Sequence, residues 1–139
     1  MRDDKRGVSM NRLLMGLMLL VTATAASAEW TRVGGSDNYI LYVDRATIRR
    51  SGNFVKMWDL KDFKTVEKSA AGYSYLSAKT QQEYDCKEER RRDVAFTWFG
   101  GKMGGGKVVY MNSDIGDKWL PILPGSVGEE LWKIACGKK

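Results

Sequence analysis

The sequence has no histidine among its 139 residues, and this absence removes much of the usual chemistry of active sites. Neither a Ser-His-Asp nor a Cys-His arrangement can be built without it, and the commonest general base and transition-metal ligand is missing. Cysteine and proline occur only twice each. No repeat, low-complexity tract or Pro/Gly/Ser-rich linker divides the chain, so the sequence predicts one domain.

Two patterns resemble catalytic motifs, but each has a better explanation. Four carboxylates lie between Asp85 and Asp93, and paired carboxylates can hydrolyse glycosides. Here they alternate with basic residues, which is typical of a salt-bridged turn in solvent. The segment Gly101–Lys107 fits G-x-x-x-x-G-K, but Val108 occupies the Ser/Thr position that would hold magnesium, and a strand follows instead of a helix. We expect a hairpin loop there, and no enzyme activity, metal or cofactor.

Residues 1–28 have the three parts of a cleavable signal peptide. A basic start precedes the apolar run from Leu13 to Ala23, and the small residues 26–28 supply a cleavage site between Ala28 and Glu29. The apolar run is shorter than the ~20 residues that a transmembrane helix needs. No cysteine before Cys86 offers a site for a lipid anchor. We therefore expect residues 29–139 to be exported, without a stable membrane anchor, to the periplasm, the cell surface or the medium.

Export changes the meaning of the two cysteines. In an oxidising compartment an even number of cysteines implies a disulfide, so we expect Cys86 to pair with Cys136. The bridge would close a loop of 50 residues, which stabilises the fold by about 4 kcal/mol in the chain-entropy model. A domain of 111 residues has little stability to spare, so this contribution is large.

Most of the mature chain has strand patterns. Tyr73–Cys86 alternates, with Cys86 on the more apolar face, as in a half-exposed antiparallel strand. Phe54–Phe63 does not alternate cleanly, and either a bulge or two covered faces would explain it. The expected strands are residues 30–33, 39–43, 48–50, 54–63, 73–86, 92–99 and 107–111.

The C-terminal segment instead predicts one short helix. Ser126 and Glu129 have the spacing of a capping box, in which each side chain bonds the other residue's backbone amide. Gly137 stands where a helix-terminating residue belongs. The apolar residues that share one helical face are Val127, Leu131, Ile134 and Ala135. The fold class is therefore α+β: antiparallel strands and a C-terminal helix that the disulfide fastens to the sheet.

Three segments of the mature chain resemble the surface-adhesin protein E family of bacterial envelope proteins. They are WTRVGGSDNYILYVDRATIRRSGNFVKMW, EYDCKEERRRDVAFTWF and WLPILPGSVGEELWKIAC, in the family's order. The resemblance implies a sheet of about six antiparallel strands, a C-terminal helix and bridged cysteines in a protein that is often a homodimer. It also implies attachment to host extracellular-matrix proteins.

The basic residues offer one candidate binding surface. Residues 29–139 carry a net charge of +4, which suits acidic partners such as lipopolysaccharide, glycosaminoglycan or acidic proteins, and nucleic acid is not expected for an exported protein. An alternative is a charged turn that keeps a sheet edge soluble. The candidate residues for an acidic ligand are Lys79, Lys87, Arg90, Arg91, Arg92, Lys102 and Lys107.

Three functions follow from these patterns. The first is a non-enzymatic binding protein of the envelope that attaches to a host matrix protein or an acidic polysaccharide. The second is a periplasmic structural or interaction protein without a host ligand. The third is an inhibitor of a cell-wall hydrolase, although a net charge of +4 would repel the mostly basic lysozymes.

Overall fold

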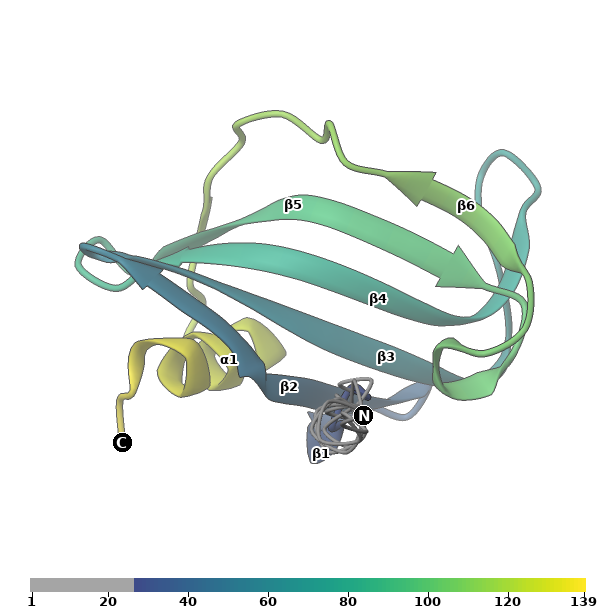
Figure 1. Ribbon diagram of the computed structural model, residues 1–139, viewed down its shortest axis with the longest axis horizontal. Coiled ribbons are helices and arrows are strands. Elements are labelled where there is room, and N and C mark those ends of the chain that lie inside the picture. Colours follow the sequence, from purple (N-terminus) through teal and green to yellow (C-terminus); the bar gives the residue numbers. More distant parts are fainter. Residues whose placement is uncertain (1–26) are drawn as a thin grey trace, which may run out of the picture.

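The computed structural model describes residues 27–139 and shows one twisted antiparallel sheet with a single α-helix (Figure 1). The predicted signal sequence lies outside the described residues except for Ser27 and Ala28. The elements are β1 (Thr31–Gly35), β2 (Tyr39–Ser51), β3 (Phe54–Lys68), β4 (Ser74–Asp85), β5 (Arg90–Phe99), the short 3₁₀ helix η1 (Lys102–Gly104), β6 (Val108–Asn112), β7 (Leu120–Pro121) and α1 (Val127–Cys136).

Each of the strands β1 to β5 pairs with the next one along the chain. Short turns between successive strands explain this order, because they allow only antiparallel neighbours. The two-residue β7 pairs with the start of β5. The expected sheet of about six strands with a C-terminal helix is therefore confirmed. Some details differ: β2 is one strand, interrupted by a register shift between Asp44 and Arg49, β3 extends to Lys68, β5 begins at Arg90, and β7 was not predicted.

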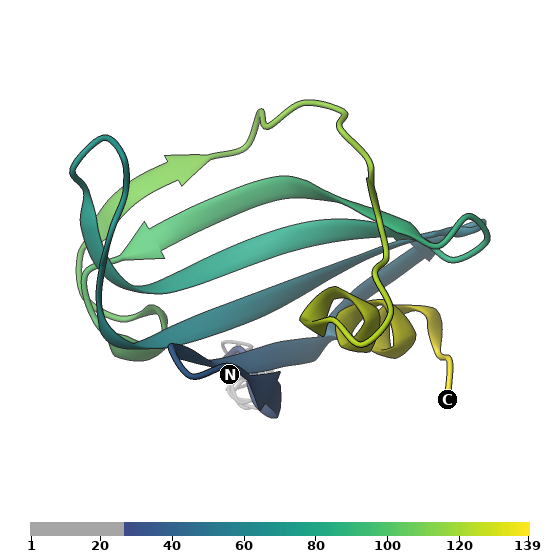
Figure 2. The same ribbon diagram turned by 180° about the vertical axis from the view of Figure 1, so that it is seen from behind.

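Helix α1 covers one end of one sheet face and leaves the rest of that face open (Figure 2). Its buried residues are Leu131, Trp132, Ala135 and Cys136, so the buried face lies slightly further round the helix than predicted. Val127 and Ile134 pack only at the margin of the core. The sheet residues buried in the same cluster are Leu41, Val43, Val55, Met57 and Tyr84.

Both ends of α1 follow local rules. The Ser126 hydroxyl accepts a hydrogen bond from the backbone N–H of Glu129 at 3.1 Å. The Glu129 carboxylate lies 2.9 Å from the Lys133 ammonium, an i,i+4 ion pair on the helix surface, and this lowers the pKa of Glu129. At the other end Gly137 adopts a left-handed backbone with φ 67°, which a glycine does at little cost.

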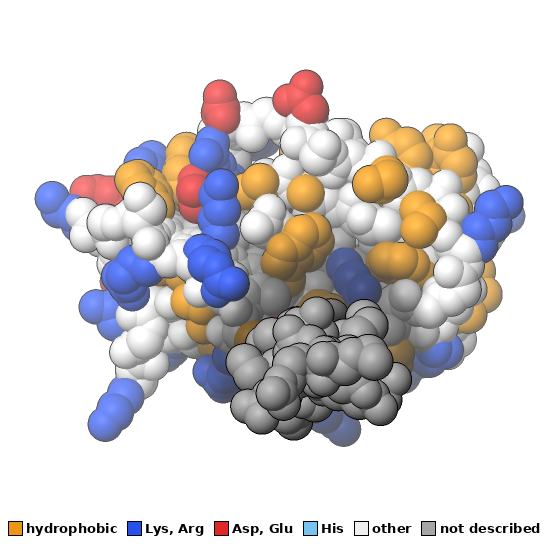
Figure 3. Space-filling view, viewed as in Figure 1, with side chains coloured by type: hydrophobic (Ala, Val, Ile, Leu, Met, Phe, Trp, Pro, Cys, Tyr) orange, Lys and Arg blue, Asp and Glu red, His pale blue; other side chains and the backbone are white. Residues whose placement is uncertain are grey.

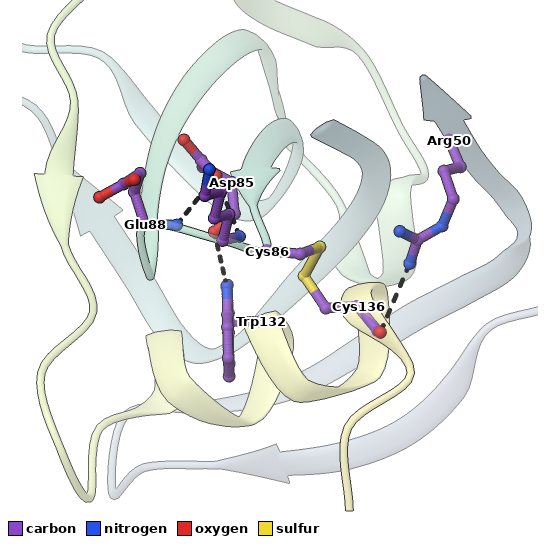
Figure 4. Close-up of a disulfide and its surroundings, with 7 residues drawn as sticks. Arg50, Asp85, Cys86, Glu88, Trp132 and Cys136 are labelled. Atoms are coloured by element: carbon purple, nitrogen blue, oxygen red, sulfur yellow. Dashed lines mark hydrogen bonds between the residues drawn. A yellow bond between two sulfur atoms is a disulfide. The ribbon is translucent and has the colours of Figure 1, made fainter. Parts of the chain in front are cut away.

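The disulfide between Cys86 and Cys136 fastens the end of α1 to the chain just after β4 (Figure 4). This confirms the expected bridge and the position of Cys86 on the apolar side of its strand. Beside it, the indole N–H of Trp132 donates a buried hydrogen bond to the backbone carbonyl of Asp85 at 3.0 Å. The guanidinium of Arg50 on β2 also donates to the backbone carbonyl of Cys136 at 3.4 Å, so one covalent bond and two hydrogen bonds join this short helix to the sheet.

The irregular apolar pattern of β3 reflects two covered faces. Pairing with β4 runs from Phe54 to Asp62 without a register shift, so no bulge separates the two parities of β3 in that stretch. Val55 and Met57 face α1, while Leu60 is buried on the opposite face. A central strand that is covered on both sides loses the simple alternation of a half-exposed one.

Among residues 27–139, no helix has the length and apolar character that a membrane span requires.

Candidate binding surfaces

The structure does not bring the predicted basic residues together on one surface. Arg91 pairs with Tyr84 across β4 and β5, which places it on the sheet face that carries α1. Arg90 and Arg92 pair with Asp85 and Glu83 and therefore face the other way. The alternation of side chains along β5 thus splits the arginine run between two faces.

Carboxylates of neighbouring strands and loops neutralise Arg90 and Arg92. Arg90 lies 3.0 Å from Asp85, and Arg92 lies 2.7 Å from both Glu83 and Asp117. Both guanidinium groups also stack on the ring of Trp119, at 4.5 and 4.9 Å from its centroid. Figure 3 shows basic side chains gathered over this end of the sheet face opposite α1. The pairing favours the salt-bridged turn over a free basic patch.

Asp85 organises the turn that follows β4. One of its carboxylate oxygens accepts hydrogen bonds from the backbone N–H groups of Lys87 and Glu88, and the other binds Arg90. Burial opposes ionisation, but these three donors together hold the pKa of Asp85 below its usual range. Lys87 itself is exposed at the tip of the turn.

The glycine-rich loop lies against the sheet. The backbone N–H of Met103 donates to Asp62 at 2.8 Å, and that of Gly104 donates to the Ser77 hydroxyl at 2.9 Å. The Lys102 ammonium lies 3.2 Å from the Asp62 carboxylate. Lys79 packs over the rings of Trp30 and Phe99, whereas Lys107 is exposed. The expected hairpin loop is thus anchored at several points, with Lys102 already paired.

A surface that the sequence did not single out lies on the α1 side of the sheet, beyond the end of the helix. Cross-strand pairing places Trp98 opposite Ala78 on β4 and opposite Tyr110 on β6, and Ala78 shares the face of Tyr84. Neighbouring rings in this group have centroids 4.5 to 6.5 Å apart. We call the group the aromatic face: Tyr39, Phe63, Tyr73, Tyr75, Phe96, Trp98 and Tyr110.

The aromatic face is open to solvent at its far end. Tyr73 is 41% exposed and Tyr110 is 37% exposed. A shallow groove of about 530 Å³ runs between these rings and the connection of β3 to β4. The neighbouring strand β6 is an edge of the sheet and also exposes Val108 and Met111. Exposed apolar surface of this kind marks interaction sites in soluble proteins, and an unpaired strand edge adds backbone donors and acceptors.

A buried polar chain connects the middle of the sheet with its surface. Asp59 is 0% exposed, and its Oδ2 accepts a hydrogen bond from the Gln82 amide at 2.9 Å. The Gln82 carbonyl oxygen in turn accepts one from Arg91 at 3.0 Å. Among the described residues neither Asp59 Oδ1 nor the Tyr84 hydroxyl has a partner. Burial raises the pKa of Asp59 to about 7 and that of Tyr84 well above its usual range.

Arg91 leads from this chain into a pocket between the sheet, β7 and the first turn of α1. The pocket has a volume of about 350 Å³, and we call it the α1 pocket. Its lining contains two cations, Lys61 and Arg91, and no carboxylate; the other lining side chains are mostly aliphatic, with Tyr39, Gln82 and Ser126 among them. Gly128 permits the close approach of Arg91 to the helix, because a Cβ there would lie 2.9 Å from the arginine Nε.

Within residues 27–139, no group of three or more His, Cys, Asp or Glu side chains is arranged to hold a metal ion. What the described surfaces offer is recognition: an aromatic face, an edge strand and a basic pocket. With its sheet, helix and disulfide, the chain thus has the features of a small disulfide-linked binding domain. The family model described as "Surface-adhesin protein E" matches residues 30–137, and the chain belongs to that family.

Solved structures agree with this fold. The chain is similar to crystal form II of Haemophilus influenzae protein E, with 13% identity, a TM-score of 0.54, and coverage of 77% of this chain and 96% of that one. Protein E from non-typeable Haemophilus influenzae matches at 12% identity and a TM-score of 0.51, covering 80% and 86% of the two chains. At such identities the likeness shows the fold alone. A comparison with curated protein sequences finds no match. Family membership indicates an adhesin-like, non-enzymatic role.

Proposed function

We propose that the mature chain is an exported binding protein of the bacterial envelope that attaches to a host extracellular-matrix protein through its aromatic face. The observation that carries this proposal is the open end of that face, where Tyr73 and Tyr110 are exposed beside the edge strand β6. Tyrosine and tryptophan are enriched among the residues that contribute most to binding, because they supply large, rigid contact surfaces.

Several features support this function over an acidic polysaccharide as ligand. The arginines that would bind sulfate or carboxylate on the outer face are already paired with Asp85, Glu83 and Asp117. A polyanion would have to displace these partners before it gained any contact. The aromatic face needs no such exchange, and membership of a surface-adhesin family agrees with a protein ligand.

The test uses the purified chain from residue 29 to residue 139 and a panel of immobilised matrix proteins, with heparin as a further surface. We expect saturable binding to at least one matrix protein. The double variant Tyr73→Ser/Tyr110→Ser should bind at least about tenfold more weakly, because interface aromatic residues commonly contribute more than 1 kcal/mol each. Both side chains are exposed, so the thermal unfolding temperature should change little.

Trp30→Ala is the matched control, because Trp30 is a partly exposed aromatic residue away from the aromatic face, beside Lys79. It should bind as the parent chain does. Analytical ultracentrifugation of the parent chain and the double variant tests whether the aromatic face is instead a homodimer interface. If the double variant only converts a dimer to a monomer and no matrix protein binds the parent, the aromatic face is a homodimer interface. The protein would then be an interaction protein without a host ligand.

A further inference from the structure

The α1 pocket contains a cationic side chain that the fold holds in place without pairing it closely with a carboxylate. Arg91 is fixed by its bond to Gln82, a neutral acceptor, at 3.0 Å. Among the described residues, the only carboxylate within 4.0 Å of its guanidinium is that of Asp93, at the limit of that distance. Arg90 and Arg92 differ, because each pairs closely with a carboxylate. A partly buried guanidinium whose nearest carboxylate lies at 4.0 Å keeps donors for a closer anion.

Gln82 keeps the buried acid away from this cation. Asp59 accepts a hydrogen bond from the amide nitrogen of Gln82, and Arg91 donates to the oxygen of the same amide. The carboxylate therefore orients the amide instead of pairing with the guanidinium. Lys61 adds a second cation to the pocket, and its ammonium lies 5.1 Å from the centre of the Tyr39 ring.

Apart from Tyr39, Gln82 and Ser126, the rest of the lining is mainly aliphatic, and it reaches the surface. Leu131 lies at the base of the helix wall, while β7 and the segment after it supply Leu120, Pro121 and Leu123. Leu123 is 61% exposed, so the apolar surface continues outside the pocket. At about 350 Å³ the pocket is at the lower end of the range for small-molecule sites, roughly 300–1,000 Å³. It suits one or two residues of a chain that continues over the rim.

We propose that the α1 pocket binds the carboxyl-terminal residue of a polypeptide, with its carboxylate on Arg91 and Lys61 and an aliphatic side chain against Leu120, Leu123 and Leu131. Arginine matches a carboxylate with two parallel N–H donors, which fixes the orientation of the chain end. Capture of a terminal carboxylate is also an established mode of peptide recognition. This site adjoins the aromatic face, with which it shares Tyr39, but it lies away from Tyr73 and Tyr110 and does not depend on their function.

The test measures fluorescence anisotropy of a fluorescein-labelled pentapeptide, Gly-Ser-Ala-Val-Leu, with a free carboxylate. We expect saturable binding, and at least about tenfold weaker binding of the same peptide as a carboxyl-terminal amide, because a charge-assisted pair is lost. Arg91→Gln should weaken binding of the free acid to a similar degree. Arg92→Gln is the matched control, since Arg92 lies on the opposite face of β5, and it should bind as the parent does.

Leu123→Ala gives a second readout that does not depend on Arg91. Its exposed side chain can be shortened with little effect on stability, and the variant should lose the preference for a peptide ending in leucine over one ending in glycine. Equal binding of acid and amide, or equal losses in Arg91→Gln and Arg92→Gln, would overturn the proposal. Binding of octanoate without binding of any peptide would show a free aliphatic carboxylate as the ligand, and the chain-end proposal would be wrong. The Tyr73→Ser/Tyr110→Ser variant should keep its affinity for the peptide.

Discussion

The buried carboxyl group of Asp59 makes a specific contribution to the pH dependence of stability. Its side chain is completely buried, one oxygen has no partner among the described residues, and the other accepts one bond from Gln82. Loss of hydration raises its pKa, while Lys61 and the Gln82 bond oppose the rise. The result is a pKa of about 7 in the folded protein, against 3.8 for an ordinary aspartate.

The sign of the effect follows from proton binding. Between about pH 4 and pH 7 the folded state keeps a proton on Asp59 that the unfolded state has lost. Stability from this group is therefore fully present at low pH and is lost as the pH rises toward 7. A difference of about three pH units corresponds to roughly 4 kcal/mol in total, or about 1.4 kcal/mol per unit.

The variant Asp59→Asn removes the titration and keeps a polar group that can bond Gln82. Urea unfolding followed by tryptophan fluorescence should be measured for both proteins from pH 4.5 to pH 8.5. We expect the free energy of unfolding of the variant, relative to the parent, to rise by about 1.4 kcal/mol per pH unit up to pH 7 and to level off above it. A difference that does not change with pH would refute this account.

Asp85→Asn is a control with the opposite sign. The pKa of Asp85 lies below the ordinary 3.8, so its stabilising contribution is present above that pH and is lost only as the pH falls further. The stability difference between this variant and the parent should therefore stay constant from pH 4.5 to pH 8.5. If the pH dependence came only from titration of an aspartate in the unfolded state, both variants would show it. A free energy of unfolding that changes with pH for Asp59→Asn but not for Asp85→Asn therefore points to the folded-state pKa of Asp59.

One further prediction follows from the signal sequence and three from the fold. Mass spectrometry of the protein from the cell envelope should give Glu29 as the first residue, and an intact amino terminus would contradict export. Ser126→Ala should destabilise the protein by about 1 kcal/mol in urea unfolding, because the first turn of α1 loses its cap. Trp132→Phe should cost about 1–3 kcal/mol in the same assay, because a buried backbone carbonyl loses its donor. Replacing Cys86 and Cys136 together with alanine should lower stability by about 4 kcal/mol, and an unchanged urea midpoint would contradict the loop-closure argument.

The features that could be predicted from the sequence are those that local rules decide. The cap at Ser126 and the glycine at position 137 bracket α1, and the alternation of β4 places Cys86 on the side that faces the helix. Alternation along the predicted strand 92–99 puts Val94, Phe96 and Trp98 on one face, and Phe96 and Trp98 do share it. Val94 does not follow this pattern, because the register between β4 and β5 shifts at this point. Gln81 pairs with Ala95 and Gln82 pairs with Asp93, so Val94 is an extra residue in a β-bulge.

The candidate sites could not be predicted, because each depends on segments far apart in the sequence. The run of arginines has the pattern of one basic patch, but its three side chains have different partners. Arg90 binds Asp85 and Arg92 binds Glu83, whereas Arg91 binds the neutral Gln82. The α1 pocket exists only because residues 120–128 fold back over β5, where β7 forms two pairs. Neither β7 nor the burial of Asp59 leaves a local signal, since a two-residue strand is too short for alternation.

The length of α1 explains why one sheet face carries two distinct surfaces. A helix of ten residues spans about 15 Å, so it covers only part of strands that run for ten to fifteen residues. The α1 pocket forms between Arg91 and the first turn of the helix, at its amino-terminal end. Beyond the pocket the helix does not cover the aromatic face. The disulfide lies at the carboxyl-terminal end of the helix. It joins Cys136 to Cys86, 50 residues earlier in the chain, and fixes the position of the helix along the sheet. A longer helix would fill the pocket and cover the rings, so the short helix and its covalent anchor together determine what the protein can bind.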